Sequence, residues 1–137
     1  MEEQKQKQEQ VDIEKLLQLA KILRDPETGC PWDKKQTFDT YKKCLVDEAQ
    51  EVVQAIDNKD MENLKEELGD TLFNLIFIVN LAEEQNLFKM QDVIEGTYNK
   101  MVQRHPHIFG NKKATTPEEA YQIFQEAKRE SKKQTSK

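Results

Sequence analysis

The stretch EELGDTLFNLIFIV, residues 66–79, contains the longest apolar run of the chain, Leu75–Val79. That run is far shorter than the roughly 20 residues that a membrane-spanning helix needs. Only Asn74 interrupts the apolar character of the second half of the stretch, and no strict alternation of apolar and polar residues suggests a strand. The stretch therefore predicts a buried helix, placed at residues 60–85, at the centre of the fold.

Further helices are predicted on both sides of this segment from apolar residues spaced three and four apart. The first of them ends before Asp25-Pro26, because the residue before a proline avoids the α region, and a loop over 26–36 follows. The last opens at Thr116, where Pro117 and Glu119 complete a capping box. The predicted fold class is all-α, an antiparallel bundle of four to five helices, with the additional helices at residues 11–23, 37–57, 91–104 and from 117 onward.

The chain has 137 residues and a net charge of −5, which favours one domain and disfavours sequence-independent binding to nucleic acid. We expect this domain at residues 11–130, between a polar N-terminal extension (1–10) and a basic C-terminal tail (131–137). The first ten residues lack the apolar core of a signal peptide. Two cysteines form neither a disulfide framework nor a C-x-x-C site. These features predict a cytoplasmic protein without a membrane partner.

Four acidic residues form two pairs on the predicted neighbouring helices. Glu48 and Glu51 are three apart, as are Glu67 and Asp70, so each pair shares one helix face. A short connection makes the two helices antiparallel neighbours, and the pairs then converge. Clustered carboxylates repel and need a cation, and oxygen ligands suit Mg²⁺ or Mn²⁺ rather than zinc. The alternative is that all four are solvated acids on helix surfaces.

Basic and aromatic residues near the C-terminal end offer complementary chemistry. Lys100 and Arg104 are four apart and suited to phosphate oxygens, although cations at a helix C-terminus also favour the helix dipole. Lys128 follows Phe124 by four residues. Either Phe124 stacks on a nucleobase and Lys128 binds phosphate, or Phe124 is a core residue and Lys128 lies beside it on the surface. Trp32, in the loop, is expected to fill a hydrophobic gap.

Four motifs, in this order, resemble those of the MazG nucleoside triphosphate pyrophosphohydrolases. The first matches the family pattern G-C-P-W-D-x-x-Q-T, and the resemblance extends over about residues 13–130. The motifs are DPETGCPWDKKQT (25–37), DEAQEVVQAI (47–56), EELGDTLFNLIF (66–77) and KMVQRHPHIFG (100–110).

The resemblance implies a Mg²⁺-dependent enzyme, with Mn²⁺ as a substitute, that cleaves nucleoside triphosphates between the α and β phosphates. It also implies a tight homodimer, which agrees with a 60–85 helix that is apolar nearly all round. The residues that correspond to the family's metal ligands are Glu48, Glu51, Glu67 and Asp70. Glu51 is our choice for the general base that takes a proton from the attacking water. The expected substrate contacts are Lys100, Arg104, Asn74, Phe124 and Lys128.

Two alternatives to this reading remain open from the sequence. One is a non-catalytic helical module that dimerises or docks a partner through the apolar face of residues 60–85. The other is a narrower enzyme that acts on dUTP, dCTP or phosphoribosyl-ATP, rather than a general enzyme or one that clears non-canonical nucleotides.

Overall fold

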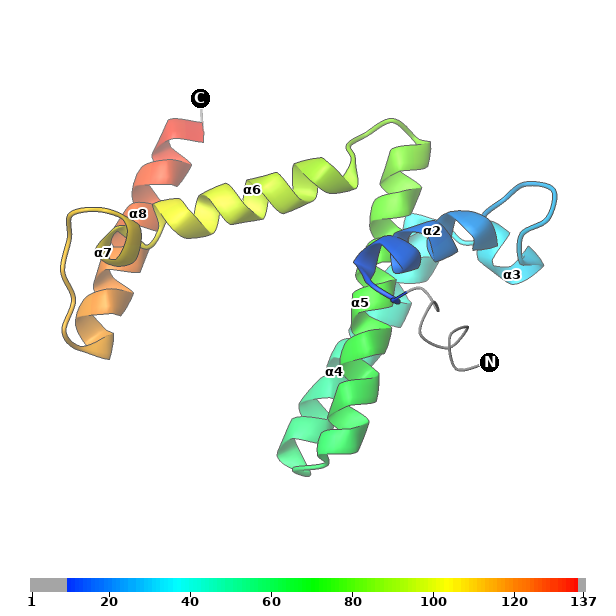
Figure 1. The fold of residues 1–137 in the computed structure, drawn as a ribbon, viewed down its shortest axis with the longest axis horizontal. Helices are drawn as coiled ribbons and strands as arrows, with labels where there is room; N and C mark the ends of the chain where they lie inside the picture. Colours follow the sequence, from blue (N-terminus) through cyan, green and yellow to red (C-terminus); the bar gives the residue numbers. More distant parts are fainter. Residues whose placement is uncertain (1–9, 136–137) are drawn as a thin grey trace. The chain divides into compact units, whose positions relative to one another are not determined.

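The computed structural model describes residues 10–135, and every regular element in that range is helical. The all-α prediction is therefore confirmed for the described part of the chain. Figure 1 shows the helices α2 (Ile13–Leu23), α3 (Pro31–Lys34), α4 (Phe38–Asp57), α5 (Met61–Glu84), α6 (Met90–Gln103), α7 (Pro106–Phe109) and α8 (Pro117–Thr135).

The chain divides into two compact units, one ending at Met90 and the other beginning at Gln91. The first unit contains α2 to α5, and the second contains α6 after its first residue, α7 and α8, so the acidic pairs and the predicted basic residues belong to different units. The expectation of one domain at 11–130 stays a prediction. The predicted polar extension over 1–10 falls outside the described residues except for residue 10.

Local capping explains why the long helices begin where the sequence predicts. The Thr37 side chain accepts a hydrogen bond from the Thr40 N–H at the start of α4, and the Asp60 side chain accepts one from the Asn63 N–H at the start of α5. In α8, Thr116 and Glu119 form the predicted capping box, with bonds of 3.2 and 3.1 Å. The predicted starts of these three helices are confirmed.

The structure corrects three sequence-based expectations. The loop over 26–36 contains a short helix, α3, because Pro31 at its first position is already in a helical conformation. Trp32 is 57% exposed and fills no gap within the described chain. Residues 131–135, predicted as a solvated tail, continue α8, since they contain neither proline nor glycine and their lysines favour a helix C-terminus.

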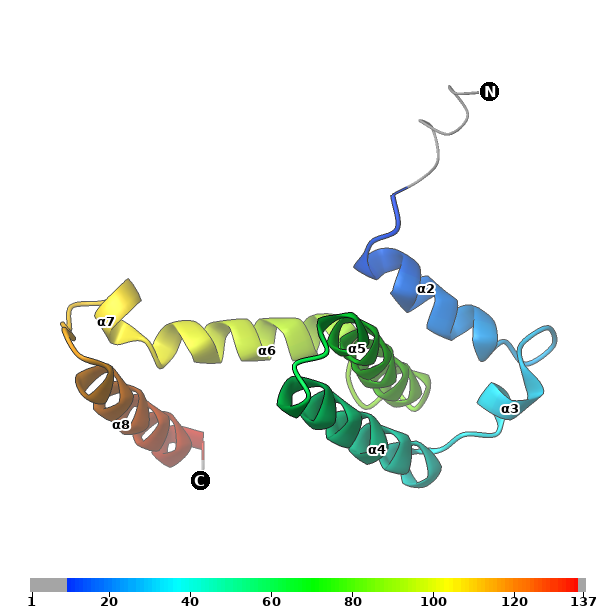
Figure 2. The ribbon, with the colours of Figure 1, turned by 90° about the horizontal axis from the view of Figure 1, so that it is seen from below.

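The first unit is built on an antiparallel pair, α4 and α5, which lie side by side in Figures 1 and 2. Helix α2 packs against α5. The core forms where α4 meets the C-terminal half of α5, and the Tyr41 ring stacks on Phe77 with centroids 4.1 Å apart. The buried residues of this cluster are Tyr41, Phe77 and Leu81, packed against Phe38, Cys44, Phe73 and Ile78.

Helix α5 carries most of the buried residues of the described chain, yet one of its faces is open. Leu68, Leu72 and Leu75 are 50%, 40% and 46% exposed. The prediction of a central buried helix is thus confirmed for the C-terminal half of α5, while the three leucines of its apolar outer face are exposed in the described part of the chain.

Arg24 connects the segment after α2 to the C-terminal end of α5. One guanidinium nitrogen donates to the carbonyl oxygens of Asp33, Lys34 and Gln36 at 2.7–3.0 Å. The other two nitrogens donate to the Glu84 carboxylate at 3.0 and 2.6 Å. Because charged bidentate pairs fix geometry, Arg24 holds α3 and the start of α4 against α5.

In the second unit, α7 packs against α8 around a buried arginine. Arg104 is 8% exposed, and its guanidinium lies 5.9 Å from the centre of the Phe124 ring. His105 contacts the same ring edge-on at 5.3 Å. No helix of the described residues is long and apolar enough to cross a bilayer.

Candidate metal centre

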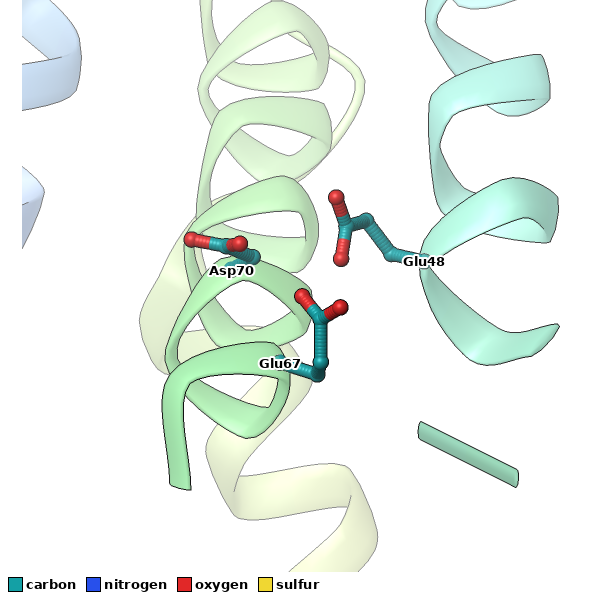
Figure 3. Close-up of side chains that lie close together, drawn as sticks. All are labelled: Glu48, Glu67 and Asp70. Carbon is teal, nitrogen blue, oxygen red and sulfur yellow. The ribbon is translucent and has the colours of Figure 1, made fainter. Parts of the chain in front are cut away.

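Three of the four predicted acidic ligands come together between α4 and α5. Glu48 extends from α4 toward α5, where Glu67 and Asp70 lie one turn apart (Figure 3). One carboxylate oxygen of each residue lies within 4.8 Å of the others. The antiparallel pairing predicted from the short α4–α5 connection therefore produces a compact cluster of oxygens, called the acidic cluster below.

Glu51, the fourth predicted ligand, lies at the edge of the acidic cluster. It is exposed on α4, one turn beyond Glu48, and is not one of the three residues whose oxygens converge. Its carboxylate nevertheless lies near enough to raise the pKa of both Glu48 and Glu67. Glu51 and Asp70 are thus the two acids of this group that are exposed to water.

The pKa values of the cluster show that its negative charges are poorly compensated. Partial withdrawal from water is the largest cause of the raised pKa of Glu67, which reaches about 7, and the charges of Glu51 and Glu48 add to it. Desolvation likewise raises the pKa of Glu48, with repulsion from Glu51 and Asp70 as the next causes. A cation at this point would remove both effects.

One oxygen of Glu48 also indicates that the acidic cluster needs a cation. Oε2 is buried and has no hydrogen-bond partner among the described residues. A buried anionic oxygen without a donor or a cation is strongly unfavourable. The donor set consists only of carboxylates, which suits a hard divalent ion such as Mg²⁺ or Mn²⁺. The residues present therefore fit the predicted metal.

Asn74, predicted as a substrate contact, is 7% exposed and both ends of its amide are occupied. Its Oδ1 accepts a hydrogen bond from the Tyr41 hydroxyl at 3.1 Å, and its Nδ2 donates to the Cys44 carbonyl at 3.3 Å. The bond between Tyr41 and Asn74 is not among the contacts expected from the sequence. The available signal was that Tyr41 and Asn74 both lie within two turns of the acidic residues on facing helix faces.

The other predicted substrate contacts lie in the second unit. Lys100 is exposed on α6, and the Arg104 N–H bonds to its carbonyl one turn later. The Arg104 side chain packs on Phe124 and donates to Ser131 at 3.4 Å, while its Nε is buried without a partner among the described residues. Lys128 is half-buried on α8. The structure thus brings Arg104 and Phe124 together, and all four roles stay predictions.

Comparison with known proteins agrees with the fold and the motifs. The MazG nucleotide pyrophosphohydrolase domain matches residues 36–109, which include all four acidic residues and the basic pair. A "Nucleoside triphosphate pyrophosphohydrolase" of Escherichia coli (strain K12) is 38% identical over 122 residues, covering 89% of this chain and 46% of that protein. A relative from Thermotoga maritima named "Nucleoside triphosphate pyrophosphohydrolase/pyrophosphatase MazG" is also 38% identical, over 88% of this chain and 45% of its own length.

The chain spans about half the length of these curated relatives. A solved structure of nearly matching length also resembles it. The crystal structure of a MazG-related protein from Thermotoga maritima aligns with a TM-score of 0.70 and 30% identity, over 85% of this chain and 98% of that one. With the domain match over more than half of its residues, the chain belongs to the MazG nucleotide pyrophosphohydrolase family.

Proposed function

We propose that this protein hydrolyses nucleoside triphosphates to a nucleoside monophosphate and pyrophosphate, with a divalent cation held by the acidic cluster. The observation that carries the proposal is the convergence of three carboxylates, one of which, Glu48, has a buried oxygen with no partner among the described residues. The names of the relatives support the reaction. Mg²⁺ is the proposed ion and Mn²⁺ its substitute, because both prefer oxygen ligands.

Glu48, Glu67 and Asp70 would hold the ion, with Glu51 at the edge of the site. When bound, the ion neutralises phosphate oxygens and makes the α phosphorus more electrophilic. Without it, the acidic cluster repels a triphosphate, so the proposed site requires the ion before the substrate enters. This requirement makes the proposed activity strictly dependent on a divalent metal.

Glu51 is the proposed base because it is exposed to water and borders the cluster. Its carboxylate takes a proton from the water that attacks the α phosphorus, and the bond from that phosphorus to the bridging oxygen breaks. Lys100 and Arg104 then neutralise the departing pyrophosphate. Phe124 is the proposed stacking contact to the nucleobase of the substrate, and Lys128 is the proposed contact to its phosphates.

We also propose that the protein works as a homodimer through the exposed apolar face of the α4–α5 pair. The open leucines of α5 form one part of this face. On α4, Val46 and Val53 are 56% and 55% exposed and line a shallow apolar depression. Sedimentation at micromolar concentration tests this, and a monomer alone contradicts it. The cytoplasmic location stays a prediction, in keeping with the two free cysteines.

The direct test of the reaction is a pyrophosphate-release assay on the eight common ribo- and deoxyribonucleoside triphosphates, with and without Mg²⁺. Asp70→Asn should abolish Mg²⁺-dependent release while the helical circular dichroism is kept. Asp57→Asn is the matched control, since it removes the same charge from the exposed end of α4, about 13 Å along the helix from Glu48. Full activity of Asp70→Asn would refute the assignment, and no release from any substrate would favour a non-catalytic module.

A further inference from the structure

A buried polar contact between α4 and α5 lies next to the acidic cluster. The Tyr41 hydroxyl donates to Asn74 Oδ1 at 3.1 Å, and Asn74 Nδ2 donates to the Cys44 carbonyl at 3.3 Å. Tyr41 and Asn74 are 5% and 7% exposed, so neither side chain faces bulk water. Both ends of the amide on α5 are therefore bonded to α4. We call this group of three residues the interhelical clamp.

The interhelical clamp lies on the same seam as the aromatic stack and the acidic cluster. Every step of three or four residues forward along α4 is matched by an equal step backward along α5, as expected for antiparallel helices in one fixed register. In order along the seam, the facing pairs are Tyr41 with Phe77, Cys44 with Asn74, and Glu48 with Asp70.

Apolar contacts alone specify the register of two helices weakly. The next arrangement is one turn away, a slide of about 5.4 Å that many aliphatic side chains can repack to fill. A buried amide is different, because a slide leaves its donor and acceptor unpaired, and a single buried asparagine is known to fix register in paired helices. In this protein the repelling carboxylates also oppose the observed register, so a specific restraint is needed.

We infer that Asn74, with Tyr41, is a positioning residue that holds α4 and α5 in the register at which Glu48 meets Glu67 and Asp70. The clamp assembles the acidic cluster before any ion arrives. This inference rests on the proposed function in one respect, namely that the acidic cluster binds a divalent cation. It gives Asn74 a role other than the substrate contact expected from the sequence, in keeping with its burial and its two occupied amide ends.

The test compares two buried asparagines of the same helix. Asn74→Leu removes both clamp hydrogen bonds and keeps the branched shape and the number of side-chain heavy atoms. Asn80→Leu is the matched control, because Asn80 is 6% exposed and also makes two side-chain bonds, to Lys21 at 3.1 Å and to Glu84 at 3.0 Å. Those partners lie on α2 and on α5 itself, away from the α4 seam. The full chain is titrated with Mn²⁺ alone and free Mn²⁺ is followed by electron paramagnetic resonance, while circular dichroism gives the melting temperature.

We expect Asn74→Leu to weaken Mn²⁺ binding about tenfold, the scale seen when residues that orient metal ligands are changed. Asn80→Leu should lower the melting temperature yet keep the wild-type Mn²⁺ affinity. Unchanged affinity in Asn74→Leu, or an equal loss in both variants, overturns the positioning role. A purely structural contribution would move the melting temperatures of both variants and the Mn²⁺ affinity of neither.

Tyr41→Phe decides the question if Asn74→Leu fails to fold. It keeps the bond from Asn74 to Cys44 and removes only the hydroxyl, so we expect a smaller loss of Mn²⁺ affinity, about threefold. Wild-type affinity in Tyr41→Phe would then overturn the inference. Absence of saturable Mn²⁺ binding by the wild-type chain refutes the metal site itself, and that result is distinct from a failure confined to the variants.

Discussion

Replacing Glu48 with glutamine should stabilise the metal-free protein while removing its stabilisation by Mg²⁺. In the folded chain, Glu48 has one oxygen within 4.8 Å of an oxygen of Glu67 and of Asp70, and its Oε2 is buried without a partner among the described residues. Glutamine has nearly the same shape but no charge. The substitution therefore relieves like-charge repulsion and replaces a buried anion with a neutral amide.

The size of this effect follows from the distances and the partial exposure of the site. Two unit charges about 4–5 Å apart repel by about 1 kcal/mol under water-like screening. Because Glu48 and Asp70 both retain contact with solvent, we take the water-like value and expect a net gain of about 1 kcal/mol. For a chain of 137 residues this corresponds to a rise of about 4 °C in the melting temperature.

The assay is thermal denaturation at pH 8 and low ionic strength, in EDTA and in excess Mg²⁺. Wild-type protein should melt at a higher temperature in Mg²⁺, because ligand binding to the folded state stabilises it, whereas Glu48→Gln should show little or no shift. Asp57→Asn, outside the acidic cluster, should keep the wild-type response to Mg²⁺. The reasoning is refuted if Glu48→Gln is destabilised in EDTA and still responds to Mg²⁺ as the wild type does.

Three further predictions follow from the same structure. The pKa of Glu67 is raised to about 7 in the folded protein, so the contribution of this group to folding stability is fully present below about pH 4.5 and is lost as pH rises toward 7. The melting temperature of the metal-free protein should therefore fall over that range, and a Glu67→Gln variant whose melting temperature falls with the wild-type slope would contradict this. Lys100→Ala should weaken binding of a non-hydrolysable triphosphate and leave Mg²⁺ affinity unchanged, as measured by calorimetric titration with each ligand, and an equal loss of both affinities would place Lys100 at the metal. Phe77→Ala removes a ring that is 0% exposed and should lower the free energy of unfolding by about 3–5 kcal/mol in urea titrations, whereas a loss under about 1 kcal/mol would mean that the stack with Tyr41 is dispensable.

The long helices could be predicted from the sequence because local signals and burial agree there. Thr37, Asp60 and Thr116 each cap the helix that follows, and apolar spacing marks the faces that pack. The short helices α3 and α7 have too few residues for periodicity to detect them. Both begin at a proline, a residue that is typical of loops but also favours the first helical position.

The acidic cluster was predictable since two spacings of three residues and one short connection are enough to make the carboxylates converge. The interhelical clamp was not, because its bonds link residues 33 and 30 positions apart and depend on how far α4 and α5 are shifted along each other. Apolar periodicity shows which face of a helix is buried but not its position along its axis. The exposure of Trp32 was missed because burial of a residue in a short connecting segment depends on what packs over it.

The most direct test of the account is X-ray diffraction from Mn²⁺-soaked crystals, measured for anomalous scattering of the metal. The account predicts a peak between α4 and α5, within about 2.0–2.4 Å of carboxylate oxygens of Glu48, Glu67 and Asp70. It also predicts that this peak is lost in Asp70→Asn. Wild-type crystals with Mn²⁺ only elsewhere on the chain, and with these three side chains directed to solvent, would contradict the metal centre and with it the proposed hydrolysis.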